Sequence, residues 1–187
     1  MKYIVGAIVV IVAAIAAILM LSSRPETSTS TDSKAKTAIK ITDYVGTFGS
    51  EVSLTTQGRI VGDDAFRSVR VTVTQYSRTV EVLKGYDNTV DKSQQFTNTR
   101  AAYDAFLHSL ANLGFTRTRK PSFPDERGVC PTGNRFVYLL KENGNDIHRS
   151  WSASCGNVGT FAGASQVRQL FQSQIPEYSK FVQGVQL

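Results

Sequence analysis

The chain has 187 residues, enough for one domain of ordinary size and a short additional segment. Hydrophobic residues make up 41% of it and aromatic residues 10%, which supports a packed core and excludes a chain disordered throughout. The formal net charge of +6 is modest and is not concentrated in a basic stripe, so we expect no nucleic-acid partner.

An apolar run without charges opens the chain. Residues 3–21 read YIVGAIVVIVAAIAAILML, and a helix of this length spans roughly 28 Å, close to the thickness of a bilayer core. A cleavable signal peptide usually has a shorter apolar core and a cleavage site of small residues, which this run does not offer. We therefore predict an uncleaved transmembrane anchor over residues 1–22, with residues 3–21 in the lipid bilayer.

A polar stretch rich in Ser and Thr follows the anchor. It contains no large apolar side chain until Ile39, so it cannot bury enough surface to offset the entropy of ordering. We predict a flexible linker over residues 23–40 and a folded domain over residues 41–187.

Three segments then alternate apolar and polar residues with a period of two: 51–62, 67–75 and 77–85. In the second, Val69, Val71 and Val73 share one face. Alternation of β-branched residues is typical of half-buried antiparallel strands, and the short connections favour a meander. Residues 86–96 predict a fourth, weaker strand.

The period next changes to that of a helix. Five apolar residues within 98–114 recur at helical spacing: Tyr103, Phe106, Leu107, Leu110 and Leu113. A second helical stripe precedes Pro176 and consists of Val167, Leu170, Phe171 and Ile175. Residues 178–185 predict a further short helix. The expected fold class is α+β: an antiparallel sheet, made of a meander and a disulfide-linked hairpin, packed by two or three helices.

The hairpin is predicted by Asn143-Gly144, a strong turn signal between two alternating runs. Placing Glu142 opposite Asn145 sets the register of the remaining pairs, which are Phe136 with Trp151, Tyr138 with Arg149 and Leu140 with Ile147. In this register the only two cysteines, Cys130 and Cys155, come close together on one face of the hairpin.

Several chemistries are open to Cys130 and Cys155. A zinc site needs about four ligands, and only His108 and His148 could add to the two cysteines. A redox dithiol favours a C-x-x-C spacing, which is absent from the sequence. Unpaired buried thiols are a further alternative. We predict a Cys130–Cys155 disulfide, and we expect no metal ion and no cofactor.

The disulfide decides the predicted orientation of the anchor. Lys and Arg counts beside the span favour the C-terminal flank as cytoplasmic, but long domains cross largely regardless of these charges. Disulfides form in oxidising compartments. We therefore predict a single-pass protein of the cell membrane with a cytoplasmic N-terminus and an extracytoplasmic C-terminal domain.

Asp146, His148 and Ser150 include the residue types of a hydrolytic triad, and their spacing puts them on one face of a strand. Neighbours on one face of a strand are about 6.6–7 Å apart, beyond the hydrogen-bond reach of a nucleophile and its base. We expect these residues to form the solvated face of the hairpin, with Trp151 on the other face, and we predict no catalytic residue.

Basic residues cluster in sequence around a proline-containing loop: Arg117, Arg119, Lys120, Arg127 and Arg135. A solvated loop accounts for them simply. Alternatively, they form a patch for an anionic partner, and we expect this partner to be an acidic envelope polymer or another envelope protein.

The sequence therefore predicts a membrane-anchored extracytoplasmic domain that serves as a non-catalytic binding or interaction module of the cell envelope. One alternative is a structural subunit of a surface assembly, similar to a pilin. Pro25 and the polar linker count against it because they interrupt any helix that continues past the membrane. A further alternative is an envelope hydrolase that uses His148.

Overall fold

The computed structural model describes residues 38–156, 158–161 and 163–187. The predicted transmembrane anchor over 1–22 and most of the predicted linker over 23–40 lie outside these residues. Within the described ranges no helix has the length and apolar character needed to cross a membrane. Ala38–Leu187 forms one compact unit, in which Ile39 and Ile41 already pack against the core.

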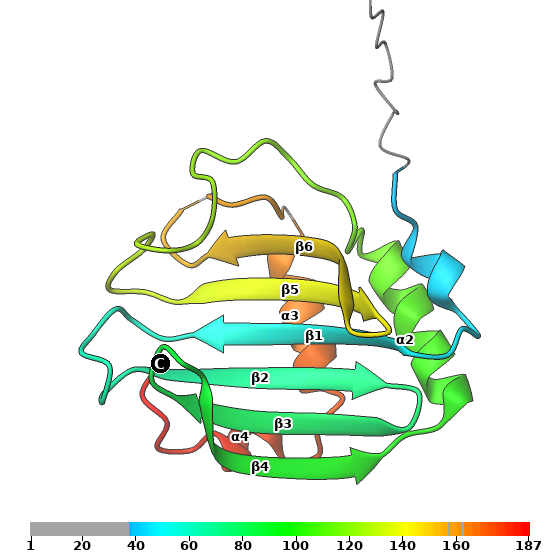
Figure 1. Ribbon diagram of the computed structural model, residues 1–187, viewed down its shortest axis with the longest axis horizontal. Coiled ribbons are helices and arrows are strands. Elements are labelled where there is room, and N and C mark those ends of the chain that lie inside the picture. The colour runs from blue at the N-terminus through cyan, green and yellow to red at the C-terminus, as the bar shows by residue number, and fades with distance from the viewer. Residues whose placement is uncertain (1–37, 157, 162) are drawn as a thin grey trace, which may run out of the picture. The chain divides into compact units, whose positions relative to one another are not determined.

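In the described part of the chain, six strands form one antiparallel sheet in the order β4-β3-β2-β1-β5-β6 (Figure 1). They are β1 (Ser50–Gln57), β2 (Arg67–Thr74), β3 (Ser77–Lys84), β4 (Thr89–Thr97), β5 (Arg135–Glu142) and β6 (Asn145–Ala153). The meander extends from β1 to the β4 edge, and the hairpin joins the other side of β1. The predicted α+β sheet of a meander and a hairpin is confirmed.

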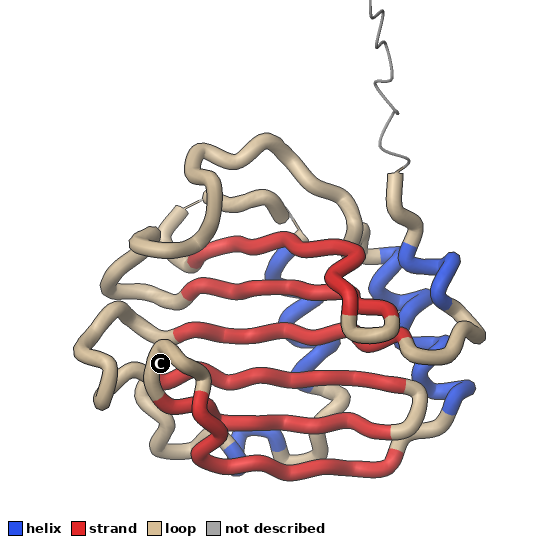
Figure 2. The backbone as a smooth tube through the Cα atoms, viewed as in Figure 1, coloured by secondary structure: helices blue, strands red, loops and turns tan. Residues whose placement is uncertain are grey.

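The helices lie on one face of this sheet, behind the strands in Figure 2. They are η1 (Ile41–Tyr44), α2 (Arg100–Asn112), α3 (Ala164–Gln172) and α4 (Tyr178–Phe181). The hydroxyl of Thr99 caps α2 by accepting a hydrogen bond from the N–H of Ala102. At the other end Gly114, with a φ of +72°, adopts the left-handed conformation that ends a helix.

The core lies between these helices and the covered face of the sheet. Alternate residues of the strands point into it, among them Val52 and Leu54 of β1 and Val71 of β2, all nearly fully buried. Phe115, which follows α2, is at the centre of an aromatic cluster. Its ring centroid lies 6.2 Å from that of Tyr138 and 6.4 Å from that of Phe171. Phe115 therefore joins α2 and α3 to β5.

The hairpin register differs from the prediction. Glu142 faces Asn145 as predicted, but the register shifts by one residue between Leu140 and Lys141. The observed pairs beyond the shift are Phe136 with Ser152, Tyr138 with Ser150 and Leu140 with His148. The predicted pairs of these strands with Trp151, Arg149 and Ile147 are therefore wrong, because the alternating sequence carries no signal for an extra residue in one strand.

The shift exchanges the two faces of β6, since successive side chains of a strand point to opposite sides. His148, only 8% exposed, and the buried Ser150 face the core instead of solvent, and the ring of His148 lies 5.8 Å from that of Phe115. The prediction that His148 and Ser150 belong to a solvated face is therefore wrong, whereas Asp146 is exposed as predicted. Trp151 points to the opposite side, where Val129 and Cys130 cover it.

We predict that Phe115→Ala lowers the free energy of unfolding by about 3–5 kcal/mol, because it leaves a cavity among aromatic rings. Phe123→Ala is the matched control, since Phe123 is exposed, and should change stability by less than about 0.5 kcal/mol. Urea denaturation followed by circular dichroism measures both. Equal losses in the two variants would contradict the central place of Phe115.

Candidate ligand pocket

The sheet face away from the helices, here called the open face, is mainly polar. It carries Glu51, Ser53, Thr55 and Gln57 of β1, Arg70 and Thr72 of β2, Glu81 of β3, and Arg135, Leu139 and Lys141 of β5. Nε of Arg70 lies 2.8 Å from a carboxylate oxygen of Glu81, and Nζ of Lys141 lies 3.9 Å from one of Glu51. Cations at the centre of this face are therefore compensated by acids.

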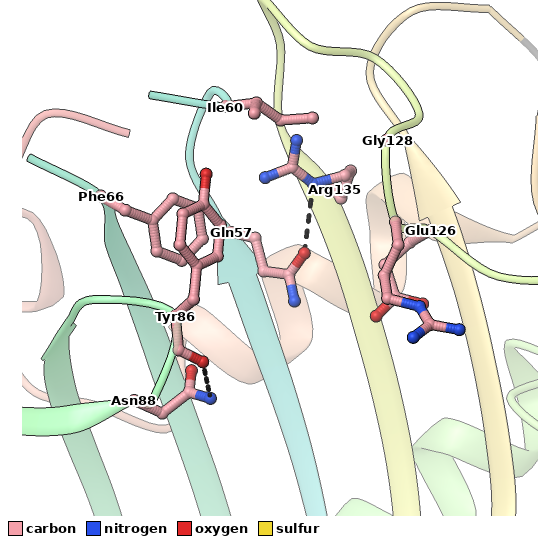
Figure 3. Close-up of a pocket in the computed structure, with 9 residues that line it drawn as sticks. Gln57, Ile60, Phe66, Tyr86, Asn88, Glu126, Gly128 and Arg135 are labelled. Carbon is pink, nitrogen blue, oxygen red and sulfur yellow. Dashed lines mark hydrogen bonds between the residues drawn. The ribbon is translucent and has the colours of Figure 1, made fainter. Parts of the chain in front are cut away.

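One end of the open face holds a pocket of about 570 Å³ (Figure 3), here called the Arg135 pocket. In the described chain it is lined by Gln57, Ile60, Phe66, Tyr86, Asn88, Glu126, Arg127, Gly128 and Arg135. The ends of β1 and β5 contribute Gln57 and Arg135. The β1–β2 loop and the β3–β4 turn contribute the aromatic side, and residues 126–128 contribute the opposite side.

Arg135 lies at the base of this pocket and is only 2% exposed. Because β1 pairs with β5, Gln57 lies directly opposite it, and Nε of Arg135 donates to Oε1 of Gln57 at 3.1 Å. Nη2 donates to the carbonyl oxygen of Gly58, and Nη1 donates to that of Val129 at 3.5 Å. These acceptors are all neutral, so they fix the guanidinium in place without cancelling its charge.

The other charges of the pocket are paired. A terminal nitrogen of Arg149 lies 2.7 Å from both carboxylate oxygens of Glu126, and Arg127 binds Asp125. Within the described ranges no carboxylate forms an ion pair with Arg135. Burial lowers the pKa of Arg135, and the nearby Tyr86 and Glu126 oppose this effect. Since an arginine stays protonated in proteins, the pocket keeps a buried positive charge.

The aromatic side of the pocket consists of two stacked rings. The rings of Phe66 and Tyr86 stack with centroids 4.1 Å apart and planes inclined by 16°. Phe66 is 3% exposed and Tyr86 is 47% exposed, so Tyr86 presents the accessible surface. The hydroxyl of Tyr86 donates to the carbonyl of Val61 at 2.9 Å, and its backbone N–H donates to Asp63 at 2.7 Å. This ring is therefore held at both ends before any ligand arrives.

The Cys130–Cys155 disulfide is confirmed, with Cα atoms 5.7 Å apart. It ties the loop before β5 to the residues that follow β6. Next to it the carbonyl of Pro131 accepts a hydrogen bond of 2.7 Å from the N–H of Ile60, and the carbonyl of Val129 binds Arg135. The disulfide thus holds the loop that positions both a cation and an apolar residue of the pocket.

The five basic residues of the predicted patch do not all lie together in the structure. Arg127 and Arg135 line the pocket. Arg119 is half-buried and its Nε donates to the carbonyl of Gly159 at 2.9 Å. Arg117 and Lys120 are exposed and do not belong to the pocket lining. Two of the five therefore meet at one site, and whether any of them binds an anionic partner stays a prediction.

Four residues of the pocket are not predicted from the sequence: Gln57, Ile60, Phe66 and Tyr86. They come from the meander, far in sequence from Arg135, and nothing in their local pattern points to a common site. The sequence predicts Tyr86 only as the first residue of the weaker strand over 86–96, whereas it lies in the turn between β3 and β4. His148 and Ser150, two of the three residues with the types of a hydrolytic triad, face the core and do not line this pocket. Among described residues no group of three or more His, Cys, Asp or Glu is arranged to hold a metal ion.

Replacing both cysteines (Cys130→Ser with Cys155→Ser) should lower the free energy of unfolding by about 3.5 kcal/mol, from loop-closure entropy alone. The fluorescence of Trp151, which packs against Cys130, reports the transition in a urea titration. Wild-type protein reduced with a dithiol is the matched control and should lose the same amount. Unchanged stability in both samples would show that the disulfide does not hold this loop.

Comparisons with protein-family models, with curated proteins and with solved structures find no match for this chain. The geometry of the Arg135 pocket is therefore the main indication of its function.

Proposed function

We propose that this protein is a membrane-anchored, non-catalytic binding module of the cell envelope, and that its extracytoplasmic domain binds an anionic group in the Arg135 pocket. The observation that carries this proposal is Arg135 itself. It is a buried cation at the base of a pocket, and in the described structure only neutral oxygens hold it.

A buried charge without a counter-charge is costly, and proteins normally pair such groups or use them to bind ligands. Elsewhere on the open face the charged side chains are paired, as Arg70 and Glu81 are. At Arg135 the protein instead supplies a fixed cation in a space open to solvent. An incoming anion completes the pair through charge-assisted hydrogen bonds, which are stronger than neutral ones.

Binding, rather than catalysis, is supported by the positions of the candidate triad residues. His148 and Ser150 lie on the covered face of the sheet, whereas the pocket lies on the open face. The side chains beside Arg135 are an amide, apolar groups and paired ions.

The membrane location is supported by two features of the chain. The uncharged run over 3–21 is long enough to span a bilayer. The disulfide is compatible with an oxidising compartment outside the cytoplasm. An anchor and a polar linker keep the pocket close to the membrane surface, which raises its effective concentration toward ligands there.

We predict that Arg135→Gln abolishes anion binding. The melting temperature of full-length protein in lipid nanodiscs is measured in the presence of carboxylates and phosphates. Each anion is compared with a neutral amide or alcohol of similar shape. Ligands that bind the native state raise the melting temperature. Anions should stabilise the wild type, and Arg135→Gln should remove this effect.

Two controls accompany that experiment. Arg70→Gln removes a compensated arginine from the same sheet face, and Arg117→Gln removes an exposed arginine of the predicted patch. Both should keep the anion-dependent increase in melting temperature. Loss of the effect in Arg117→Gln, with Arg135→Gln unchanged, would move the anion site to the loop and reject the proposal.

The membrane orientation is tested separately in intact cells. A membrane-impermeant amine reagent should label the exposed Lys120. Unfolded, unreduced protein should take up no thiol reagent at Cys130 or Cys155, and reduction should expose both thiols to the reagent, as mass spectrometry will show. Protection of Lys120 together with two free thiols would place the domain in the cytoplasm.

A further inference from the structure

We infer that the Arg135 pocket binds an organic monocarboxylate whose carboxylate is carried on a flat, apolar group. This inference rests on the proposed function and adds the chemical class of the ligand. It follows from the hydrogen-bonding capacity of Arg135, the charge balance around it and the shape of the aromatic side.

The guanidinium of Arg135 has donors to spare. An arginine carries five N–H groups, one on Nε and two on each terminal nitrogen. Within the described chain Nε, Nη1 and Nη2 each donate one hydrogen bond, to Gln57, Val129 and Gly58. One N–H on each terminal nitrogen is left for a ligand. A carboxylate matches this pair, because its two coplanar oxygens accept two hydrogen bonds from one guanidinium.

The balance of charges in the pocket lining favours a ligand with a single negative charge. Arg149 neutralises Glu126, and Arg127 neutralises Asp125 and lowers the pKa of that carboxyl group through hydrogen bonds. In the described structure this leaves one uncompensated cation in the lining, Arg135. A phosphate monoester carries close to two negative charges at neutral pH, so its second charge would be desolvated without a partner.

The aromatic side provides room for the remainder of the ligand. Figure 3 shows the Arg135 guanidinium extending toward the Phe66–Tyr86 pair, with Ile60 beside it. The pocket volume of about 570 Å³ lies in the range of small-molecule sites and far exceeds what a carboxylate alone fills. Tyr86 is stacked on Phe66 and keeps an exposed surface. A flat apolar group can therefore stack on Tyr86 while its carboxylate reaches Arg135.

Four simple probes test this inference by isothermal titration of the full-length, disulfide-bonded protein in nanodiscs: phenylacetate, acetate, phenylacetamide and phenyl phosphate. Phenylacetate should bind at least about tenfold more tightly than each of the others, since it alone combines one negative charge with a ring. Arg135→Gln should weaken phenylacetate by at least about tenfold. Tyr86→Ala should weaken phenylacetate about two- to tenfold and leave acetate unchanged.

The matched control for Tyr86 is Tyr76, an exposed tyrosine in the turn at the other end of β3. Tyr76→Ala should not change the affinity for phenylacetate. Because Arg135 is buried, its replacement can interfere with folding, so Ile60→Trp provides a second variant. Ile60 is exposed at the rim, and a larger ring there should fill the pocket and weaken phenylacetate.

The outcomes separate the ligand class from the proposed function. If acetate and phenyl phosphate bind as tightly as phenylacetate and Tyr86→Ala has no effect, the monocarboxylate class is wrong, while loss in Arg135→Gln still supports an anion site. If phenylacetamide matches phenylacetate, or if neither Arg135→Gln nor Ile60→Trp weakens binding, both proposals fail. No heat of phenylacetate binding at about 10 mM also rejects the ligand class.

Discussion

Pairing between β1 and β5 is the interaction on which the rest of the structure depends. It joins the meander and the hairpin, which are separated in sequence by α2 and a long loop, into one continuous sheet. The covered face of that sheet is then wide enough to bury the aromatic cluster around Phe115. On the open face the same pairing places Gln57 opposite Arg135. Core and pocket are therefore two consequences of one strand pair.

The pocket also requires that Arg135 be fixed without being neutralised. Carbonyl oxygens of Gly58 and Val129 and the amide oxygen of Gln57 achieve this, since they accept hydrogen bonds but carry no net charge. The position of Val129 depends in turn on the loop that the Cys130–Cys155 disulfide closes. The disulfide thus helps to hold the Arg135 guanidinium in place through the carbonyl of Val129. The loop before β5 therefore contributes both to the stability of the domain and to the binding site.

A single-residue irregularity in the hairpin has large effects because strand faces alternate. With the extra residue at Ile147, His148 and Ser150 enter the core, and Trp151 turns to the side that the Val129–Cys130 segment covers. Without it, Trp151 would compete with α3 and Phe161 for the covered face. The bulge therefore separates Trp151 from the aromatic cluster around Phe115 and decides which side chains of β6 enter the main core.

The local pattern of the sequence determined the helices and strands. Alternating valines predicted β2, and the apolar stripe that ends at Gly114 predicted α2. Asn143-Gly144 predicted the turn between β5 and β6. The chain has only two cysteines, one on each side of that turn, and this placement predicted the disulfide. Only the tertiary structure decided the position of the hairpin bulge and the placement of Tyr86 and Arg135 in one pocket. The physical reason is that periodicity and turn chemistry act over a few residues, whereas register and pocket geometry depend on packing between segments distant in sequence.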